Sequence, residues 1–160
     1  MLAGLEGGEG GSGVMLVRNG ESWTPPAFYT MGAGSIGLQF GAQASEVVLL
    51  LMTKRAVDAV LFNKVKLGAD ASVAAGPIGA GIEASTTTNF REDVYSYSKS
   101  KGLFAGASVE GAVIEQRESL NREYYGRNVT PEEILFKNAV INPNADPLRE
   151  ALNALLRSRT

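Results

Sequence analysis

The sequence of 160 residues contains no cysteine and no histidine. Their absence excludes disulfide bonds, thiol chemistry, zinc or iron sites built from Cys and His, and every Ser-His or Cys-His catalytic arrangement. Enzymatic chemistry would have to use carboxylates, Lys, Tyr or a Ser/Lys pair, or a hard metal held by carboxylates. These options stay open, but the carboxylates are scattered along the sequence, so an enzyme is the least favoured of the functions considered. We expect a protein that is not an enzyme, with no catalytic residues, no metal site and no cofactor.

Long hydrophobic runs are also absent. The longest unbroken apolar run, Val47 to Met52, is far shorter than the roughly 18 residues that cross a bilayer. Residues 1–13 have neither the basic start nor the apolar centre of a signal peptide. We expect no transmembrane segment and no signal peptide, and these features leave the localisation open.

Neither sign of charge dominates, because 15 Lys and Arg stand against 17 Asp and Glu for a net charge of −2. This balance argues against a nucleic-acid partner bound through bulk charge. The length and the 44% hydrophobic fraction suit one globular domain. We expect a flexible, Gly-rich N-terminus over residues 1–13 and a single domain over residues 14–160.

Glycine is abundant, with 19 residues, and several lie inside segments with the alternation of a strand. From residue 35 to residue 41, Ile36, Leu38 and Phe40 fall on one face, while Gly and Ser occupy most of the other. A face without side chains allows another backbone to approach closely or a sheet to bend sharply. We therefore expect a strongly coiled or closed antiparallel sheet.

The pattern of hydrophobic residues and turn signals predicts an α+β fold that is rich in β-structure. About six to seven strands are expected, drawn from residues 14–17, 27–44, 46–52, 66–75, 78–85, 94–98 and 102–116. One internal helix follows the capping residue Thr53 and runs to about Asn63. Residues 121–126 form a short helix or turn, and two C-terminal helices begin at Thr130-Pro131 and Asp146-Pro147.

Two stretches match the dinucleotide-binding pattern G-x-G-x-x-G, at residues 8–13 and 32–37. That motif works only where a strand precedes the glycines and the N-terminus of a helix follows them. Strand-like residues follow both stretches, so chance or bending of the sheet explains them. Residues 33–37 also look like a nucleophile elbow, but the chain has no histidine to complete a triad.

Basic residues gather in two parts of the sequence. One group brackets the internal helix, and the other flanks the tip of the expected hairpin, next to two apolar residues. The nonfunctional interpretation is that these residues form an ordinary charged surface exposed to solvent. The functional interpretation is a patch for anionic lipid headgroups, where each cation contributes roughly 1 kcal/mol. The candidate lipid-binding residues are Lys54, Arg55, Lys64, Lys66, Lys99, Lys101, Leu103 and Phe104.

Several separated blocks, in the right order across about residues 11–135, resemble the SYLF domain family. They are Gly20-Glu21-Ser22-Trp23 with Pro26-Ala27-Phe28, Gly34 to Gly41, Gly68 to Pro77 and Tyr95 to Gly106. The family usually has a longer N-terminal portion where this sequence has the Gly-rich residues 1–13. Glu46 stands where an aspartate is usual.

This resemblance implies a noncatalytic domain that binds anionic phospholipids or phosphoinositides at a membrane surface. In fungal and animal members it also implies contact with actin or an actin regulator, and bacterial relatives suggest the cell envelope. The alternative is a protein-interaction or structural module without direct lipid binding, which docks through the Gly-lined sheet or through the Leu stripe at residues 148–156. The oligomeric state stays open.

Overall fold

The structure, a computed structural model, describes residues 2–5, 11–20, 22–33, 46–77, 91–100, 103–137 and 139–157. The strands are β1 (Leu2–Leu5), β2 (Gly11–Met15), β3 (Arg18–Asn19), β4 (Ser22–Trp23), β5 (Ala27–Ala33), β6 (Glu46–Leu51), β7 (Val65–Lys66), β8 (Val73–Ala75), β9 (Val94–Ser100), β10 (Leu103–Gly106) and β11 (Ala112–Gln116). The helices are α1 (Lys54–Phe62), α3 (Glu118–Tyr125), α4 (Pro131–Leu135), the 3₁₀ helix η1 (Pro143–Ala145) and α5 (Asp146–Arg157).

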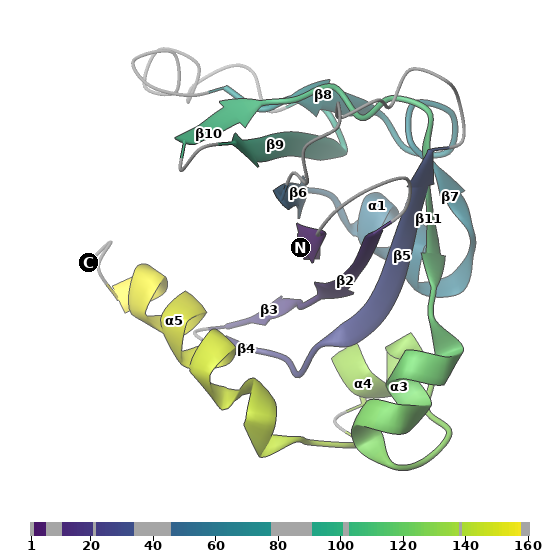
Figure 1. Cartoon of the computed structure of the whole chain (residues 1–160), viewed down its shortest axis with the longest axis vertical. Helices are drawn as coiled ribbons and strands as arrows, with labels where there is room; N and C mark the ends of the chain where they lie inside the picture. Colours follow the sequence, from purple (N-terminus) through teal and green to yellow (C-terminus); the bar gives the residue numbers. More distant parts are fainter. Residues whose placement is uncertain are drawn as a thin grey trace.

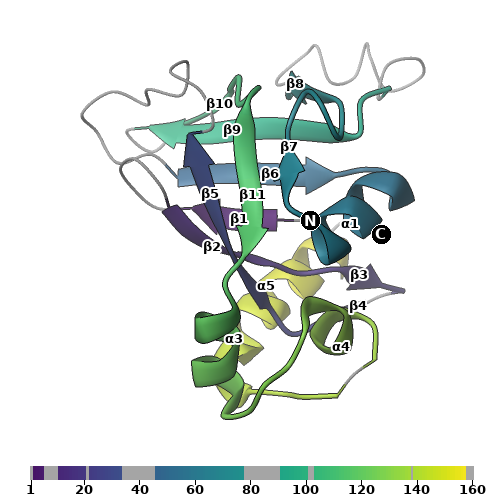
Figure 2. The same cartoon turned by 90° about the vertical axis from the view of Figure 1, so that its right-hand side faces the viewer.

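One sheet of nine strands organises the molecule (Figure 1). Its order is β10-β9-β6-β1-β2-β5-β11-β7, and β8 lies beside β9. Every pair in this sheet is antiparallel except β8 with β9. In Figure 2, β5 and β11 run across the direction of β6 and β9, as in a strongly twisted sheet. Strands β3 and β4 pair separately.

The predicted β-rich α+β class is confirmed, but closure into a barrel is not. Strands β10 and β7 stand at the two ends of the order, and no ladder joins them within the described ranges. The structure also has eleven strands rather than six or seven, and three α-helices rather than two follow β11 among the described residues. The segment expected as a helix or turn near residue 121 is the additional helix, α3.

Strands β1 and β2, near the beginning of the chain, are part of the sheet, and the flexibility expected of residues 1–13 stays a prediction. Strand β1 lies between β2 and β6, with Leu2 opposite both Met15 and Leu49. Strand β2 begins at Gly11 and pairs with β5. The expected strand at residues 78–85 and the whole of the Gly-lined stretch at residues 35–41 lie outside the described residues.

Two strands expected to be long are each broken by a turn. Residues 66–75 divide into β7 and β8 around Gly68, and residues 102–116 divide into β10 and β11 around Gly111. Both glycines have a positive φ, of 93° and 91°, which favours glycine because it has no Cβ. Hydrophobic residues continue through both turns, so the hydrophobic pattern alone does not reveal the breaks.

The helix boundaries follow the signals in the sequence. The side chain of Thr53 accepts a hydrogen bond from the Ala56 N–H at the start of α1. Thr130 and Glu133 form a reciprocal capping box at α4, and Gly126 ends α3 in the left-handed conformation. These local contacts confirm the predicted starts of α1 and α4 and the predicted stop at Gly126.

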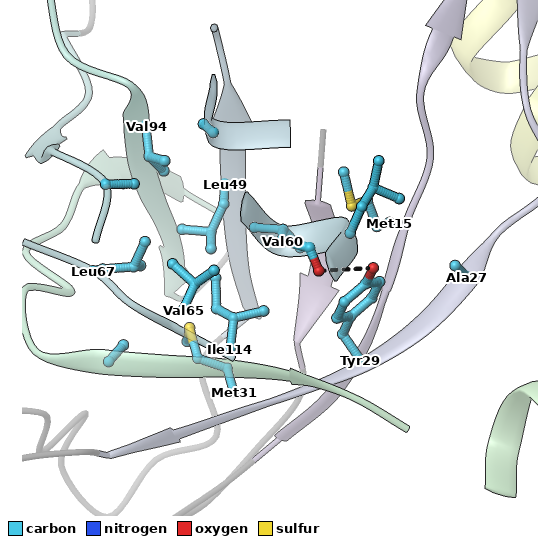
Figure 3. Packing of buried hydrophobic residues seen from close by; sticks show 14 of the residues in the cluster. Met15, Ala27, Tyr29, Met31, Leu49, Val60, Val65, Leu67, Val94 and Ile114 are labelled. Atoms are coloured by element: carbon cyan, nitrogen blue, oxygen red, sulfur yellow. Dashed lines mark hydrogen bonds between the residues drawn. The ribbon is translucent and has the colours of Figure 1, made fainter. Parts of the chain in front are cut away.

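Helix α1 covers one face of the sheet and closes the hydrophobic core. Its buried residues Ala56, Val60 and Leu61 belong to the same cluster as buried residues of β2, β5, β6 and β11. Figure 3 shows Tyr29 of β5 beside this helix, where its hydroxyl donates a hydrogen bond to the Val60 carbonyl. Burial raises the pKa of the Tyr29 hydroxyl, which therefore stays protonated and remains a donor.

Glycine permits a close backbone approach where β8 and β10 meet along β9. A Cβ placed on Gly106 would overlap the backbone oxygen of Gly76. At the same point the buried hydroxyl of Ser96 donates to the carbonyls of Ala74 and Ala107. Glycine therefore admits another backbone at this junction, while the Gly-lined faces for which this was expected lie outside the described residues.

Asn121 of α3 provides a testable link between the helices and the sheet. It is fully buried, and its Oδ1 accepts a hydrogen bond from the Phe28 N–H at 2.7 Å. Asn121→Ala leaves that N–H without its acceptor, so we expect the free energy of unfolding to fall by about 1–3 kcal/mol in urea denaturation. Ser119→Ala, at an exposed site on the same helix, is expected to change it by less than about 0.5 kcal/mol. Equal losses would contradict this role.

Candidate functional site

The candidate cations lie in three places in the fold. Lys54 and Arg55 form the first turn of α1, Lys64 and Lys66 flank the start of β7 at one end of the sheet order, and Lys99 lies on β9 near the other end. Leu103 begins β10 and is 75% exposed. Phe104 lies on β10 opposite Lys99, and Lys101 lies outside the described residues.

The strand register separates the α1 cations from the hairpin. Lys99 pairs with Glu46 at the first residue of β6, and Val94 pairs with Leu51 at its last residue. Because a strand advances about 3.3 Å per residue, the two ends of β6 are about 17 Å apart. Figure 2 shows α1 beyond one end of β6 and the tip of β9 at the other. Lys99 and the two cations of α1 thus form separate contact points at opposite ends of the β6–β9 pair.

These cations differ in how freely they can meet a ligand. Lys99 lies 3.9 Å from Glu46, and Lys64 lies 4.0 Å from Glu115. Exposed pairs of this kind contribute little to stability and compete poorly with another anion. Lys54 and Lys66 are exposed, and neither side chain makes an ion pair within the described part of the chain. Both ammonium groups are therefore available to an anionic partner.

Arg55 has a structural partner in the buried carboxylate of Asp93. The Arg55 guanidinium donates to Asp93 Oδ2. Thr53 Oγ1 donates to Asp93 Oδ1 at 2.7 Å, and the backbone N–H and hydroxyl of Ser72 donate to Oδ2 at 3.0 and 3.2 Å. The hydrogen bond from Arg55, together with the Thr53 and Ser72 donors, holds the pKa of Asp93 well below its usual range despite burial.

The Asp93 cluster, comprising Thr53, Arg55, Ser72 and Asp93, fixes the corner at which β6 becomes α1. The Met52 N–H donates to the Asp93 carbonyl at 2.8 Å, and the Val94 N–H donates to the Ser72 carbonyl at 3.0 Å. The start of α1 is thereby tied to the start of β9 and the approach to β8. This arrangement sets the direction of Lys54.

An apolar cleft lies beside this corner. It has a volume of about 390 Å³, and it is bounded by the β3–β4 hairpin, the end of β6 and the first turns of α1. Its lining residues are Val17, Arg18, Trp23, Leu50, Leu51, Met52, Thr53, Lys54 and Val57. Met52 is half-exposed. Among the described residues of this lining, the charged ones are Arg18 and Lys54, and both are cations.

Two other clefts have a different character. A cleft of about 500 Å³ near the end of α1 combines Lys64 and Arg117 with two glutamates. A third, of about 430 Å³, combines Arg122 with two glutamates. Of these three sites, the cleft beside Trp23 alone joins an apolar lining to charge of a single sign. We therefore take it, with the exposed cations, as the candidate functional site.

Sequence reasoning identified the exposed cations of this site, Lys54 and Lys66, but missed the cleft. Arg18 and Met52 come from segments far apart in the chain, and nothing local in either segment marks a cleft. Trp23 lies in a block that resembles the SYLF family, which was the one available signal. The role of Asp93 was also missed, because its partners Thr53 and Ser72 lie 40 and 21 residues away.

Metal binding and membrane spanning find no support in the described ranges. Within them, no group of three or more carboxylates is placed to hold a metal ion. None of the helices described is long and apolar enough to cross a membrane.

Comparison with known proteins places the chain in a family. The model for Ysc84, described as "Las17-binding protein actin regulator", matches residues 32–155. The chain therefore belongs to the Ysc84 family, which confirms the resemblance to the SYLF domain.

Curated relatives from fungi and animals are similar over nearly the whole chain. "Protein YSC84" of Saccharomyces cerevisiae is 39% identical over 154 residues, which cover 94% of this chain and 33% of the relative. "LAS seventeen-binding protein 3" of the same species is 38% identical, with 94% and 34% covered. "SH3 domain-containing YSC84-like protein 1" of Rattus norvegicus is 35% identical over 148 residues, with 91% and 43% covered. The chain thus spans 33% to 43% of the length of these relatives.

The Asp93 cluster predicts a pH-dependent loss of stability. Asp93→Asn removes the charge that Arg55, Thr53 and Ser72 stabilise, so the free energy of unfolding at pH 7 is expected to fall by about 2–3 kcal/mol. A carboxylate with a lowered pKa stabilises the fold above its unfolded pKa, and this contribution disappears as the pH falls toward the folded value. The difference between wild type and variant is therefore expected to shrink below about pH 4.

Urea denaturation between pH 7 and about pH 3 measures this difference. Glu92→Gln, at the adjacent and partly exposed position, serves as the matched control and is expected to lose less than about 0.5 kcal/mol. A difference between wild type and Asp93→Asn that stays constant over the whole range would contradict the role of the ionised carboxylate.

Proposed function

We propose that this domain is a noncatalytic module that binds anionic phospholipids or phosphoinositides at a membrane surface, including that of a cell envelope. The observation that carries the proposal is the exposure of Lys54 and Lys66, which make no ion pair with any described residue, together with a cationic rim on an apolar cleft. Membrane surfaces that contain anionic lipids attract such residues with roughly 1 kcal/mol each.

The hairpin supplies a second contact to the same membrane. Leu103 is largely exposed, and Lys99 lies 3.9 Å from Glu46. Lys99 pairs with Phe104, so Leu103 lies on the other face of the hairpin. Near the tip of a hairpin, a cation can bind a headgroup while an exposed apolar side chain enters the interface. In this proposal Lys64 and Lys101 add charge, Phe104 adds apolar contact, and Arg55 serves mainly to hold Asp93.

Vesicle sedimentation tests the lipid-binding proposal. We expect binding to vesicles with anionic lipid, weak binding to neutral vesicles, and weaker binding as salt rises from about 50 to about 300 mM, because salt screens exposed charges. The double variant Lys54→Glu/Lys66→Glu is expected to bind at least about tenfold more weakly.

The control is Arg122→Glu/Lys137→Glu, which makes the same change of charge on exposed residues of the C-terminal helical part. This variant is expected to bind within about twofold of wild type. Equal recovery on neutral and anionic vesicles, or equal losses in the two double variants, would contradict a lipid site at these cations.

A protein-interaction module is the second candidate function. Large apolar side chains are exposed around the last helices, with Phe136 at 49%, Ile141 at 76% and Leu148 at 38%. Exposed apolar residues close together in a chain often mark a protein contact. The family description names an actin regulator, so we propose filamentous actin or an actin regulator as the partner for this second function.

Co-sedimentation with actin filaments separates the two candidates. If the apolar residues bind actin, Ile141→Glu is expected to weaken co-sedimentation at least about fivefold, the effect of losing one important interface residue. Leu103→Glu changes a comparably exposed leucine in the hairpin and is expected to leave actin binding unchanged while weakening vesicle binding. No co-sedimentation of the wild-type chain would exclude direct binding to filaments.

A further inference from the structure

We propose that the cleft beside Trp23 holds one acyl chain of an anionic lipid, with the headgroup at Arg18 and Lys54. This inference rests on the proposed lipid-binding function and deepens it. In place of a purely electrostatic contact, it assigns a defined site to the acyl chain and to the charged headgroup of the lipid. The occupant is a membrane lipid that carries a negative headgroup.

The lining of the cleft suits an acyl chain. Its walls come from Val17 and Trp23 on one side and from Leu50, Leu51 and Val57 on the other. All five are only partly buried, although they are apolar. A volume of about 390 Å³ falls within the range of sites that bind small ligands, roughly 300–1,000 Å³. An apolar ligand of this size would remove these side chains from water.

Charge selects the headgroup. Arg18 and Lys54 stand at the cleft, and none of the described residues that line it is acidic. The Lys54 ammonium makes no ion pair within the described ranges, while the Arg18 Nε donates to the Gly20 carbonyl and leaves its other N–H groups for a ligand. A negative headgroup complements both cations, whereas a neutral amphiphile would gain only the apolar contact.

Met52 connects the cleft to its surroundings. Its side chain lines the cleft and is also 50% exposed. It directly precedes Thr53, whose hydroxyl is held by Asp93. An exposed, flexible side chain at the opening of an apolar site can move aside to admit an acyl chain and then cover the bound acyl chain. The Asp93 cluster keeps this opening and Lys54 next to each other.

The single tryptophan of the chain provides a direct reporter. Trp23 lines the cleft, and its buried Nε1 has no hydrogen-bond partner within the described part of the molecule. Both its fluorescence and the NMR signal of its indole N–H should therefore respond when the cleft is filled. The signal needs no label and is unique in the chain.

The experiment titrates the whole chain with lysophosphatidylglycerol below its micelle concentration. Two further ligands are compared, lysophosphatidylcholine of the same chain length and glycerol 3-phosphate without a chain. We expect a saturable change in the Trp23 signals with the first, at least about tenfold weaker binding of the second, which lacks net charge, and no response to the third. Equal binding of the two lysolipids would overturn the assignment of the headgroup.

Substitutions in the cleft and at Lys54 test where the acyl chain and the headgroup bind. Val57→Phe fills the cleft, and Met52→Gln makes its opening polar without adding bulk, so the second variant serves if the first fails to fold. Both are expected to weaken lysophosphatidylglycerol binding at least about tenfold. Lys54→Glu is expected to do the same, while Lys137→Glu, an exposed lysine on another part of the surface, stays within about twofold.

Vesicle binding separates the two levels of the proposal. Wild type that binds anionic vesicles but shows no Trp23 response to soluble lipid would overturn the cleft assignment and leave the membrane function standing. A chain that binds neither would overturn the proposed function itself. If Val57→Phe no longer binds the soluble lipid but still binds vesicles in a salt-sensitive way, the result would support both the acyl-chain site in the cleft and the charge-driven binding to membranes.

Discussion

The buried carboxylate of Asp93 is the interaction on which the candidate site depends. Carboxylates are rarely buried unless donors surround them, and here Thr53 and Arg55 at the start of α1 and Ser72 before β8 supply those donors. The carbonyl of the same residue accepts from Met52. One residue therefore fixes the end of β6, the first turn of α1 and the start of β9 together.

The consequence for function lies in what this corner presents to solvent. Arg55 is engaged with Asp93, so the adjacent Lys54 is the cation of α1 left for a ligand. Beside it, Met52 and Trp23 border an apolar cleft whose charged lining residues are cations. Residues 52–55 would then contribute three things to lipid binding. Arg55 holds Asp93 in a structural ion pair, Lys54 offers its ammonium group to the headgroup, and Met52 adds apolar contact.

The local features of the fold could be predicted from the sequence because their causes are local. Thr53 and Thr130 cap helices through bonds to residues three positions away. The β-rich α+β class, β6 and the β9–β10 hairpin followed from hydrophobic patterns and turn residues. The breaks at Gly68 and Gly111 did not, because a positive φ leaves the hydrophobic pattern unchanged. Whether the sheet stays open or closes into a barrel depends on the strand order, which no local signal in the sequence encodes.

The candidate site was predictable only in its charges. A list of lysines cannot show that Lys99 and Lys54 lie at opposite ends of β6, or that Arg55 has a buried partner. Trp23 lay in a block shared with the SYLF family, but its neighbours in the cleft come from β3, β6 and α1. Tertiary structure brings these segments together, and it is where the lipid hypothesis gains a specific location.

Backbone NMR of the chain with anionic and with neutral lipid nanodiscs tests most directly where a membrane meets this domain. The site described above predicts perturbations that require anionic lipid, centred on Arg18, Trp23 and residues 52–54, with a second group at the β9–β10 hairpin. Perturbations confined to residues 136–148, or equal effects of neutral and anionic nanodiscs, would contradict it.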